Sequence, residues 1–458
     1  MFNSLPEVSC AAELYFNNRF PGYRLKQYRT EESGRFCFIL EPSELGVICP
    51  KCQQYCLRFK DTRTLTVLDY DNGAGGPCVV LIPRRRLRCR CKCTATEPMP
   101  SWILPKHRIT VRLAAFAQHL LNLRVSISDV AALTGIDWDL LKEIDKSALE
   151  LRFKNKDLGR VKRLAIDEIS IHKKHQFATV FMDLENREIL EVIKGKSIEN
   201  IRPFFERLKA DNFAENIQSV SVDMNAAYPK VIKEYLGNAK LAYDLFHVMQ
   251  HFTTDVLKEA KKHSIAQARQ TDRELKPRDK TIEAKQELSI AVSTVKNAEW
   301  LVVTDPSLLT PEKVEKLQRL RAVNRLFSDL YPLAAKLRLI WRSLSQEVAR
   351  NELQETIELC EVIALEHDFK PIQKFAGMLK RRAEGIVNAC RVGLGTNILE
   401  GANNTAKVIK RLAYGFKDFE YFKYKLMGAF PGRNCDNPLN DQRSFIWNGR
   451  VQTLVFPQ

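Results

Sequence analysis

The stretch RLAIDEISI (residues 163–171) places an aspartate, Asp167, in the middle of a short apolar run. A run of this length and composition is typical of a buried or half-buried strand. A carboxylate inside such a strand is costly unless it is paired or binds a cation. Asp167 is therefore a candidate for a functional acid.

The residues that follow predict further strands and helices in a defined order. FATVFMDLEN (177–186) and REILEVIKGK (187–196) predict an antiparallel meander together with residues 163–171. Next come an amphipathic helix (197–210), a buried strand, NIQSVSVDM (216–224), a helix (227–236) and a further strand and turn, AKLAYDLFH (239–247). Three strands, helix, strand, helix, strand is the order of an RNase H-like core.

Two acids occupy informative places in this order. Asp167 lies in the middle of the first strand, and Asp223 lies just past the end of the fourth. In an RNase H-like topology the first and fourth strands are neighbours. We therefore expect both carboxylates to reach one edge of the sheet.

A third acid belongs to the stretch NILEGANNTAKVIKRLAYGFKDFEYFKYKLM (397–427), which predicts one helix or two in close succession. Its apolar face is predicted to comprise Leu399, Ala402, Ala406, Ile409 and Leu412. A polar stripe on the same helix comprises Glu400, Asn403 or Asn404, Lys407 and Arg411. An acid, amides and two cations in one stripe suit a metal-bound phosphate.

The end of the same stretch alternates cations with aromatic residues. Lys410, Lys417, Lys423 and Lys425 are interleaved with Tyr414, Phe416, Phe419, Tyr421, Phe422 and Tyr424. This pattern predicts phosphate contacts, with base stacking on the aromatic rings, to a polynucleotide. The alternative is an amphipathic helix with a solvated basic face and aromatic core residues.

Composition narrows the class of protein. The chain has 458 residues, too many for one compact core, so two to four domains are expected. A net charge of +17 favours a polyanionic partner, nucleic acid first and an anionic membrane surface second. No apolar run has the length of a membrane span, and the first residues resemble no export signal. We therefore expect a cytoplasmic protein.

Seven of the twelve cysteines lie between Cys49 and Cys93, which indicates metal binding in a reducing compartment. The cysteines form two sets, one in CPKC (49–52) and one in RRRLRCRCKC (84–93). The two sets lie about 40 residues apart in the sequence, as a zinc ribbon requires. The predicted zinc ligands are Cys49, Cys52, Cys89 and Cys93, with Cys91 or Cys56 as substitutes. The alternative is a metal-free hairpin with exposed thiols. The basic run predicts DNA contacts from Arg84, Arg85, Arg86, Arg88 and Arg90, and Lys410 is a further candidate.

Residues 101–158 predict a helix-turn-helix. TVRLAAFAQHLLNL (110–123) is helical, Ser126 or Ser128 can cap the next helix, and a turn at Thr134 and Gly135 leads into a third. The start of that third helix is acidic, which is unfavourable in a major groove. The alternative is a packing or dimerising role.

Phosphodiester hydrolysis and strand transfer need carboxylates that hold two divalent cations, Mg²⁺ or Mn²⁺. Asp167, Asp223 and Glu400 meet that need, but spacing alone does not select them among 55 acidic residues. The selection is supported by the motifs IDEISIHKKHQFATVFMDL (166–184), SVDMNAAYPKVI (221–232), AYDLFHVMQHF (242–252) and EGANNTAKVIKRLAYGF (400–416). In this order, and together with the cysteine motifs, they resemble the DDE transposases of the bacterial ISL3 insertion-sequence family.

The resemblance covers most of the chain and implies a catalytic triad of Asp167, Asp223 and Glu400. Asp244 and His247 match the DxFH element of the family, which implies a supporting role at the active site. The alternative for these two residues is a pair that stabilises the fold. The resemblance also implies an N-terminal zinc-binding and helix-turn-helix unit that binds terminal inverted repeats.

The predicted organisation is multidomain α/β with an RNase H-like core interrupted by an all-α insertion. Its segments are a lead-in (1–45), a zinc ribbon (46–100), a helix-turn-helix (101–158), the first part of the core (159–256), the insertion (257–390), the last core helix with Glu400 (391–427) and a loop-like tail (428–458).

The predicted function is a nucleoid-associated transposase that binds double-stranded DNA as a dimer or larger oligomer. It would cut strands at the ends of its element and join them to target DNA. Two alternatives remain at this point. One is a degenerate or domesticated copy that only binds DNA, and the other is an RNase H-like nuclease without strand transfer.

Overall fold

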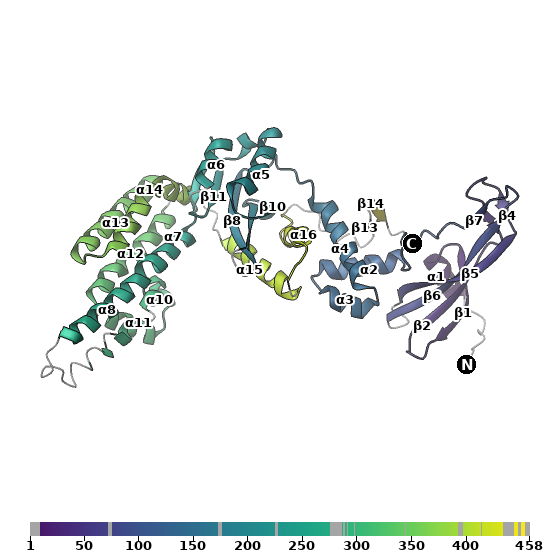
Figure 1. Ribbon diagram of the computed structural model, residues 1–458, viewed down its shortest axis with the longest axis horizontal. Coiled ribbons are helices and arrows are strands. Elements are labelled where there is room, and N and C mark those ends of the chain that lie inside the picture. The colour runs from purple at the N-terminus through teal and green to yellow at the C-terminus, as the bar shows by residue number, and fades with distance from the viewer. Residues whose placement is uncertain are drawn as a thin grey trace. The chain divides into compact units, whose positions relative to one another are not determined.

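A computed structural model describes residues 10–71, 76–172, 176–224, 228–274, 286, 289–290, 292–296, 298–343, 345–392, 397–413, 415–433, 444–447 and 450–453 (Figure 1). The chain divides into two compact units. The first comprises residues 1–155, 408–428 and 434–458, and the second comprises residues 156–407 and 429–433. Within the described residues, no helix combines the length and the apolar character needed to cross a bilayer.

The first unit contains a sheet with the strand order β1-β2-β6-β5, and β7 pairs with β6. The strands are β1 (Tyr23–Thr30), β2 (Phe36–Pro42), β5 (Phe59–Asp71), β6 (Gly76–Arg88) and β7 (Thr94–Thr96). The segment predicted as a separate lead-in therefore contributes strands to the same sheet as the predicted ribbon, because β2 runs parallel to β6. Residues 72–75, between β5 and β6, lie outside the described residues.

Alternation along the long β5–β6 hairpin buries one face of this sheet. Val67, Val80 and Ile82 are fully buried, and they pack in one cluster with Phe20 from the end of α1 (Cys10–Arg19). This period of two is what the apolar runs of the sequence predict for a half-buried strand. A short hairpin, β3 (Val47–Ile48) with β4 (Tyr55–Cys56), carries the first cysteine pair.

Three helices follow the sheet, namely α2 (Val111–Asn122), α3 (Ile127–Thr134) and α4 (Trp138–Phe153). Ser126 caps α3 through its side chain, as predicted, and accepts a hydrogen bond from the Asp129 amide at 3.1 Å. Gly135 ends α3 with a left-handed φ of 71°, a conformation that glycine adopts without a Cβ clash. The helix, tight turn and helix expected from the sequence are present.

The stretch 397–427 forms two helices, α15 (Asn397–Leu412) and α16 (Phe419–Ala429). Leu399, Ala402, Ala406 and Ile409 are buried as predicted, but Leu412 is about half exposed. The prediction of base stacking by Tyr421, Phe422 and Tyr424 is wrong, because all three rings are buried in the protein core. The alternative of aromatic core residues on an amphipathic helix is correct for them.

The second unit contains a sheet with the order β10-β9-β8-β11-β12. Its strands are β8 (Arg163–His172), β9 (Gln176–Asp183), β10 (Glu188–Lys194), β11 (Ser219–Val222) and β12 (Lys240–Tyr243). The first three strands form an antiparallel meander, whereas β11 is parallel to both β8 and β12. The strand that follows the helix thus lies beside the first strand, as expected from the sequence.

Helices flank this sheet. The helix α5 (Ile198–Ala210) packs on it by stacking Phe204 against Phe181, with ring centroids 4.0 Å apart. Between β11 and β12 lies α6 (Tyr228–Tyr235), and after β12 come α7 (Leu245–His251) and a π-helical turn, η2 (Phe252–Leu257). The helix α14 (Lys370–Val392) reaches the edge strand, where Asn388 donates to the Leu241 carbonyl at 3.0 Å.

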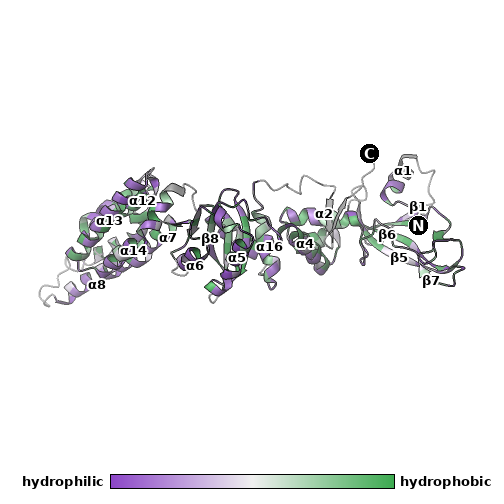
Figure 2. Ribbon diagram, turned by 90° about the horizontal axis from the view of Figure 1, so that it is seen from above, coloured by the Kyte–Doolittle hydropathy of each residue, from purple (hydrophilic) through white to green (hydrophobic). Residues whose placement is uncertain are grey.

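The described residues between η2 and residue 392 are largely helical. They form α8 (Lys258–Glu274), α10 (Ala298–Val303), η4 (Pro306–Leu308), α11 (Pro311–Val323), α12 (Arg325–Arg342), α13 (Gln346–Glu366) and α14. Figure 2 shows hydrophobic and hydrophilic positions alternating along α12, α13 and α14, as expected for amphipathic helices that share a buried interior. The predicted loop-like tail contains a hairpin instead, β13 (Ser444–Trp447) with β14 (Arg450–Thr453).

A buried acid joins α4 to α16 within the first unit. Asp145 is 1% exposed, accepts a hydrogen bond from the Tyr421 hydroxyl and forms an ion pair with Lys425 at 2.8 Å. Burial, and after it the charge of Asp145, raises the pKa of Tyr421.

We expect Asp145→Ala to lower the free energy of unfolding by about 3 kcal/mol, because it leaves a buried hydroxyl and an ammonium group without their acceptor. Urea unfolding of the full chain measures this. The control is Glu143→Ala, an exposed acid on the same helix. Equal stability of the two variants would contradict a structural role for Asp145.

Candidate active site and cysteine cluster

Asp167 and Asp223 are placed side by side by strand register. In the parallel pair β8 and β11, Ile166 is the partner of Val222, and each of these residues is followed by one of the two acids. Parallel strands that are in register present their next residues at the same level of the sheet. Asp167 and Asp223 are therefore expected at the same level, at the end of β11.

The Asp167 carboxylate is largely buried, with 8% of the residue exposed. One oxygen accepts a hydrogen bond from the Glu168 amide at 2.7 Å, and the other accepts one from the Asn403 side-chain amide at 2.8 Å. Burial raises the pKa of Asp167, and these two donors only partly offset that effect. The site therefore holds a carboxylate whose charge is incompletely compensated.

His247 lies between the two acids. Asp244 follows β12 and caps α7, accepting a hydrogen bond from the Phe246 amide at 2.9 Å. This cap fixes the start of the helix that carries His247. The Nδ1 atom of His247 is 3.2 Å from Asp223, and its Nε2 atom is 4.0 Å from Asp167. The predicted pair Asp244 and His247 thus has one member that positions a helix and one that contacts both acids.

The helix α15, which carries the third acid, contacts Asp167 through another of its residues. Asn403, which donates to Asp167, lies three residues after Glu400, so the two side chains are neighbours on one helical face. Glu400 itself is exposed. Asn404 and Lys407 are also exposed and bond to each other at 3.2 Å, and the predicted stripe ends at the exposed Arg411.

Two groups of potential metal ligands have donor atoms that all lie within 4.8 Å of one another, among the residues that the structure describes. They are Cys49, Cys52, Cys89 and Cys91, and Asp329, Glu366 and His367. Among the described residues, Asp167, Asp223 and Glu400 do not form such a close group. Strand register relates Asp167 to Asp223, and Asn403 links the helix of Glu400 to Asp167.

Sequence reasoning missed three residues that contact the positions directly after the two strand acids. Arg382, on α14, donates to the Met224 carbonyl directly after Asp223. The Tyr228 hydroxyl donates to Glu168, the residue after Asp167, at 3.0 Å, and Lys196 pairs with Glu168 at 3.2 Å. No local pattern marks these residues, because each comes from an element remote in sequence from the acid that it supports.

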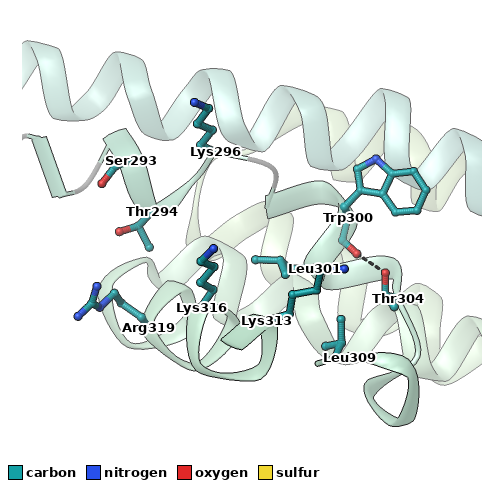
Figure 3. A pocket seen from close by; sticks show the side chains of 10 residues that line it. All are labelled: Ser293, Thr294, Lys296, Trp300, Leu301, Thr304, Leu309, Lys313, Lys316 and Arg319. Atoms are coloured by element: carbon teal, nitrogen blue, oxygen red, sulfur yellow. Dashed lines mark hydrogen bonds between the residues drawn. The ribbon is translucent and has the colours of Figure 1, made fainter. Parts of the chain in front are cut away.

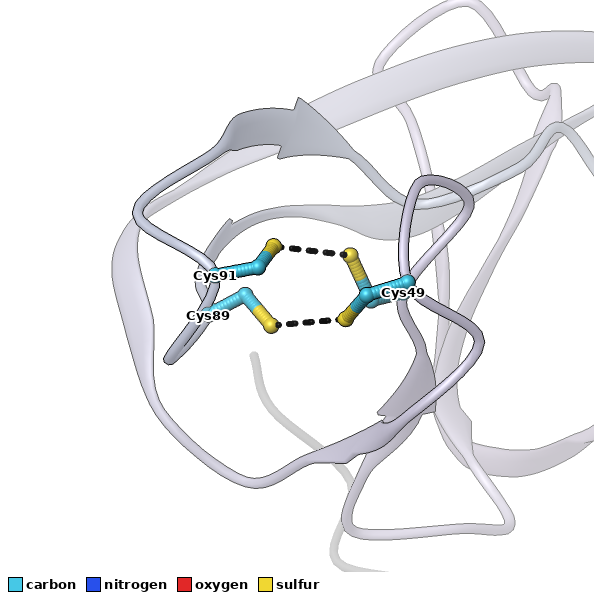
Figure 4. A group of neighbouring side chains, drawn as sticks. Cys49, Cys89 and Cys91 are labelled. Atoms are coloured by element: carbon cyan, nitrogen blue, oxygen red, sulfur yellow. Dashed lines mark hydrogen bonds between the residues drawn. The ribbon is translucent and has the colours of Figure 1, made fainter.

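The cysteine cluster forms where two turns of the first unit face each other. Figure 4 shows Cys49 opposite Cys91, with sulfur atoms 3.9 Å apart, and a second pair, Cys52 and Cys89, is 3.4 Å apart. Tetrahedral zinc with Zn–S bonds of about 2.3 Å requires sulfur atoms about 3.8 Å apart. Cys93 is 3.3 Å from Cys49 but lies outside the close group of four, so the geometry favours the predicted substitute Cys91 over Cys93.

Backbone amide groups favour the thiolate form of one member of this cluster, Cys49. Amide groups of Cys52 and Lys51 hydrogen-bond to the Cys49 sulfur and lower the pKa of that thiol to about 6. Thiolates are the form of cysteine that binds metals. Cys56, the other predicted substitute, is buried next to the cluster, and its thiol donates to the Gln54 carbonyl.

The basic residues predicted to contact DNA fall into two classes. The first class has partners within the protein. Arg84 donates to the Pro98 carbonyl, Arg85 pairs with buried Glu97 at 2.9 Å, and Arg86 pairs with Asp61. In contrast, Arg88 and Arg90 are exposed beside the cysteine cluster. Lys410 is half-buried on α15, and burial lowers its pKa.

Comparisons with known proteins identify the family of this chain. Residues 164–426 match a family model described as a transposase, the DDE type of the ISL3 group, and residues 97–149 match the helix-turn-helix domain of transposase family ISL3. The chain belongs to the ISL3 family of transposases. It is therefore a DNA transposase, with Asp167, Asp223 and Glu400 inside the matched region.

Two relatives illustrate the family. The transposase for insertion sequence element IS1001 of Bordetella parapertussis is 31% identical over 88% of this chain and 93% of its own length. The transposase for insertion sequence element IS1557 of Mycobacterium tuberculosis is 25% identical over 64% of each chain. Among solved structures, the Drosophila P element transposase strand transfer complex aligns with a TM-score of 0.38 at 11% identity, over 73% of this chain and 95% of that one.

The contact between Asn403 and Asp167 can be tested by stability. We expect Asn403→Ala to lower the free energy of unfolding by about 1–3 kcal/mol, because a buried carboxylate loses a hydrogen-bond donor. The matched control is Asn404→Ala, which removes an exposed amide from the adjacent position of the same helix. Thermal unfolding measures the stability of both variants. Equal stabilities would contradict the contact between Asn403 and Asp167.

Proposed function

We propose that this transposase cuts and joins DNA strands with Asp167, Asp223 and Glu400. The three acids would belong to an RNase H-like core, residues 159–256 and 391–427, which an α-helical insertion (257–390) interrupts. The observation that supports the proposal is the parallel pairing of β8 and β11 in register, in which Ile166 and Val222, the residues before Asp167 and Asp223, are partners. The Asn403 contact supports Glu400 as the third member.

The donor set fits divalent cations. Three carboxylates are hard oxygen ligands of the kind that Mg²⁺ or Mn²⁺ prefers, and a cation would reduce the cost of burying ionised Asp167. When bound, a pair of such ions polarises the attacking and leaving oxygens of a phosphodiester. The protein itself would hold the three acids in place, and Asn403 and Asp244 would act as positioning residues.

The remaining polar residues of the site would serve the DNA. His247, between the two strand acids, is placed to accept or hold a proton near the reacting phosphate. Asn404, Lys407 and Arg411 would contact the phosphate backbone from the exposed face of α15.

DNA ends would be recognised by the first unit. We propose that the helix-turn-helix (101–158) and the zinc ribbon (46–100), with exposed Arg88 and Arg90, bind the terminal inverted repeats. The lead-in (1–45) would complete the sheet of the ribbon. Because two ends must be joined in one reaction, a dimer or larger oligomer on DNA is proposed.

The triad proposal predicts a separation of cleavage from binding. Asp167→Asn and Glu400→Gln are expected to reduce divalent-dependent nicking of an inverted-repeat duplex by at least about a thousandfold, because several kcal/mol of charge stabilisation is lost. End binding, measured by gel shift, is expected to stay within a factor of a few. The control is Glu206→Gln, an exposed acid on α5 of the same unit.

Nicking at the wild-type rate by either triad variant would overturn the proposal. A wild-type chain that binds ends but neither nicks nor joins them would indicate a copy that only binds DNA. Nicking without joining of the 3′-hydroxyl to target DNA would indicate a nuclease.

We further propose that the cysteine cluster binds one zinc ion through Cys49, Cys52, Cys89 and Cys91. The sulfur distances and the backbone donors to Cys49 support it. Structural zinc contributes directly to folding in small units of this kind.

Cys91→Ser is therefore expected to abolish stoichiometric zinc, measured by mass spectrometry of the metal, and to lower the melting temperature of the first unit. Cys93→Ser, two residues away, is the matched control and is expected to retain the metal. The opposite result would make Cys93 the fourth ligand, as the cysteine spacing first predicted. Retention of zinc by a Cys49→Ser and Cys52→Ser double variant would overturn the site.

A further inference from the structure

A second polar site lies among the helices of the second unit, remote in sequence from the three acids. It is a cavity of about 770 Å³ between α11, α10 and the residues that precede α10 (Figure 3). We call it the Trp300 pocket. It is lined by Ser293, Thr294, Lys296, Trp300, Leu301, Thr304, Leu309, Lys313, Lys316 and Arg319. Its size is that of a site for a small ligand or for a segment of a larger one.

The charge of this pocket is entirely positive. Four of the lining residues are cations, Lys296, Lys313, Lys316 and Arg319, and no lining residue is acidic. All four are exposed. In Figure 3 the cations extend along the cavity, from Arg319 at one end toward Trp300 at the other.

Among the described residues, no carboxylate forms an ion pair with these four cations, in contrast to cations on α8, α12 and α13 of the same unit. Lys336 pairs with Glu355 at 2.7 Å, Arg350 with Glu384 at 3.0 Å, and Lys261 with Glu299 at 3.4 Å. No such pair involves the four pocket cations within the described part of the chain. Glu312 and Glu315 precede Lys316 and Arg319 by four residues, yet neither forms an ion pair with them there. A run of unneutralised cations is suited to successive phosphates.

Trp300 adds an aromatic surface to this charge. It is 71% exposed, whereas Ala298 and Val302 on the other side of α10 are buried. The backbone at this position is fixed, because the Thr304 hydroxyl donates to the Trp300 carbonyl at 2.6 Å. An indole left outside the core, in a pocket that four cations also line, offers a free face for a planar ring.

We propose that the Trp300 pocket binds a single-stranded segment of nucleic acid, with phosphates on Lys313, Lys316 and Arg319 and an unpaired base stacked on Trp300. Cations that track a backbone next to an aromatic platform are the two components of single-strand binding sites. This inference rests on the proposed action on DNA, since strand cleavage and joining generate unpaired ends. An acidic peptide would satisfy the cations but would leave the indole unused.

The experiment measures binding of a fluorescein-labelled ten-nucleotide dT strand to the full chain by anisotropy, over a series of salt concentrations. Trp300→Ala is expected to weaken binding by about tenfold, because one base loses its stacking partner. Trp300→Phe, which keeps an aromatic ring, is expected to restore most of the affinity. The triple variant K313Q, K316Q and R319Q is expected to reduce the slope of log affinity against log salt by about 2, at about 0.7 per phosphate contact.

The matched control is the triple variant K262Q, R350Q and K380Q. It removes the same charge from the same unit, but from cations that already pair with Glu259, Glu384 and Glu361. Its salt slope is expected to equal that of the wild type. Circular dichroism confirms that each variant is folded, as expected for changes at exposed positions.

Three outcomes would overturn the inference. They are unchanged affinity in Trp300→Ala, equal salt slopes for the two triple variants, and displacement of the strand by dTMP at the same nucleotide concentration, which would assign the pocket to a free nucleotide. Failure of the proposed function is a separate result. In that case the wild type does not nick the inverted-repeat duplex, independently of its measured affinity for the dT strand.

Discussion

The carboxylate of Asp167 lies in the apolar interior of the second unit, and the structure around it reduces the cost of burying it. A buried ionised carboxyl is tolerated only with hydrogen-bond donors or a cation nearby. The donors come from the next residue of its own strand and from Asn403 on α15. These groups come together only if β8, β11, α7 and α15 pack against one another. The geometry of the site therefore depends on the packing of this unit.

The two candidate metal centres are built in opposite ways. The four cysteines come from two short turns about forty residues apart, and backbone amides of one turn already favour a thiolate. The three acids come from strands and a helix spread over more than two hundred residues. A cluster on adjacent turns can form with its metal in a small unit. The acid site exists only when the whole second unit has folded.

Positive charge in this transposase is divided between structural and available cations. Arg85 and Lys425 neutralise buried acids, so their charge stabilises the fold and does not attract DNA. Arg88, Arg90 and the cations of the Trp300 pocket remain exposed. Net charge therefore indicates a polyanionic partner but overstates the number of residues that can contact it. The aromatic rings of Tyr421, Phe422 and Tyr424 on α16 are likewise buried in the fold, so they are not available to stack on bases.

The sequence by itself determined what depends on neighbouring residues. The order of strands and helices in the second unit, the cap at Ser126, the left-handed turn at Gly135 and the strand position of Asp167 all follow from short-range patterns. The two cysteine groups and the family motifs are also short-range patterns of the sequence. Periodicity and local hydrogen bonding act over a few residues, so they can be recognised in a linear sequence.

Only the tertiary structure decided which polar groups meet. Asn403 bonds to Asp167, Arg382 supports the segment after Asp223, and Cys91 rather than Cys93 completes the close group of sulfurs. It also showed that the segment predicted as a lead-in shares a sheet with β6. These contacts join residues far apart in the chain. They depend on strand register and helix packing, which a linear pattern of residue types does not specify.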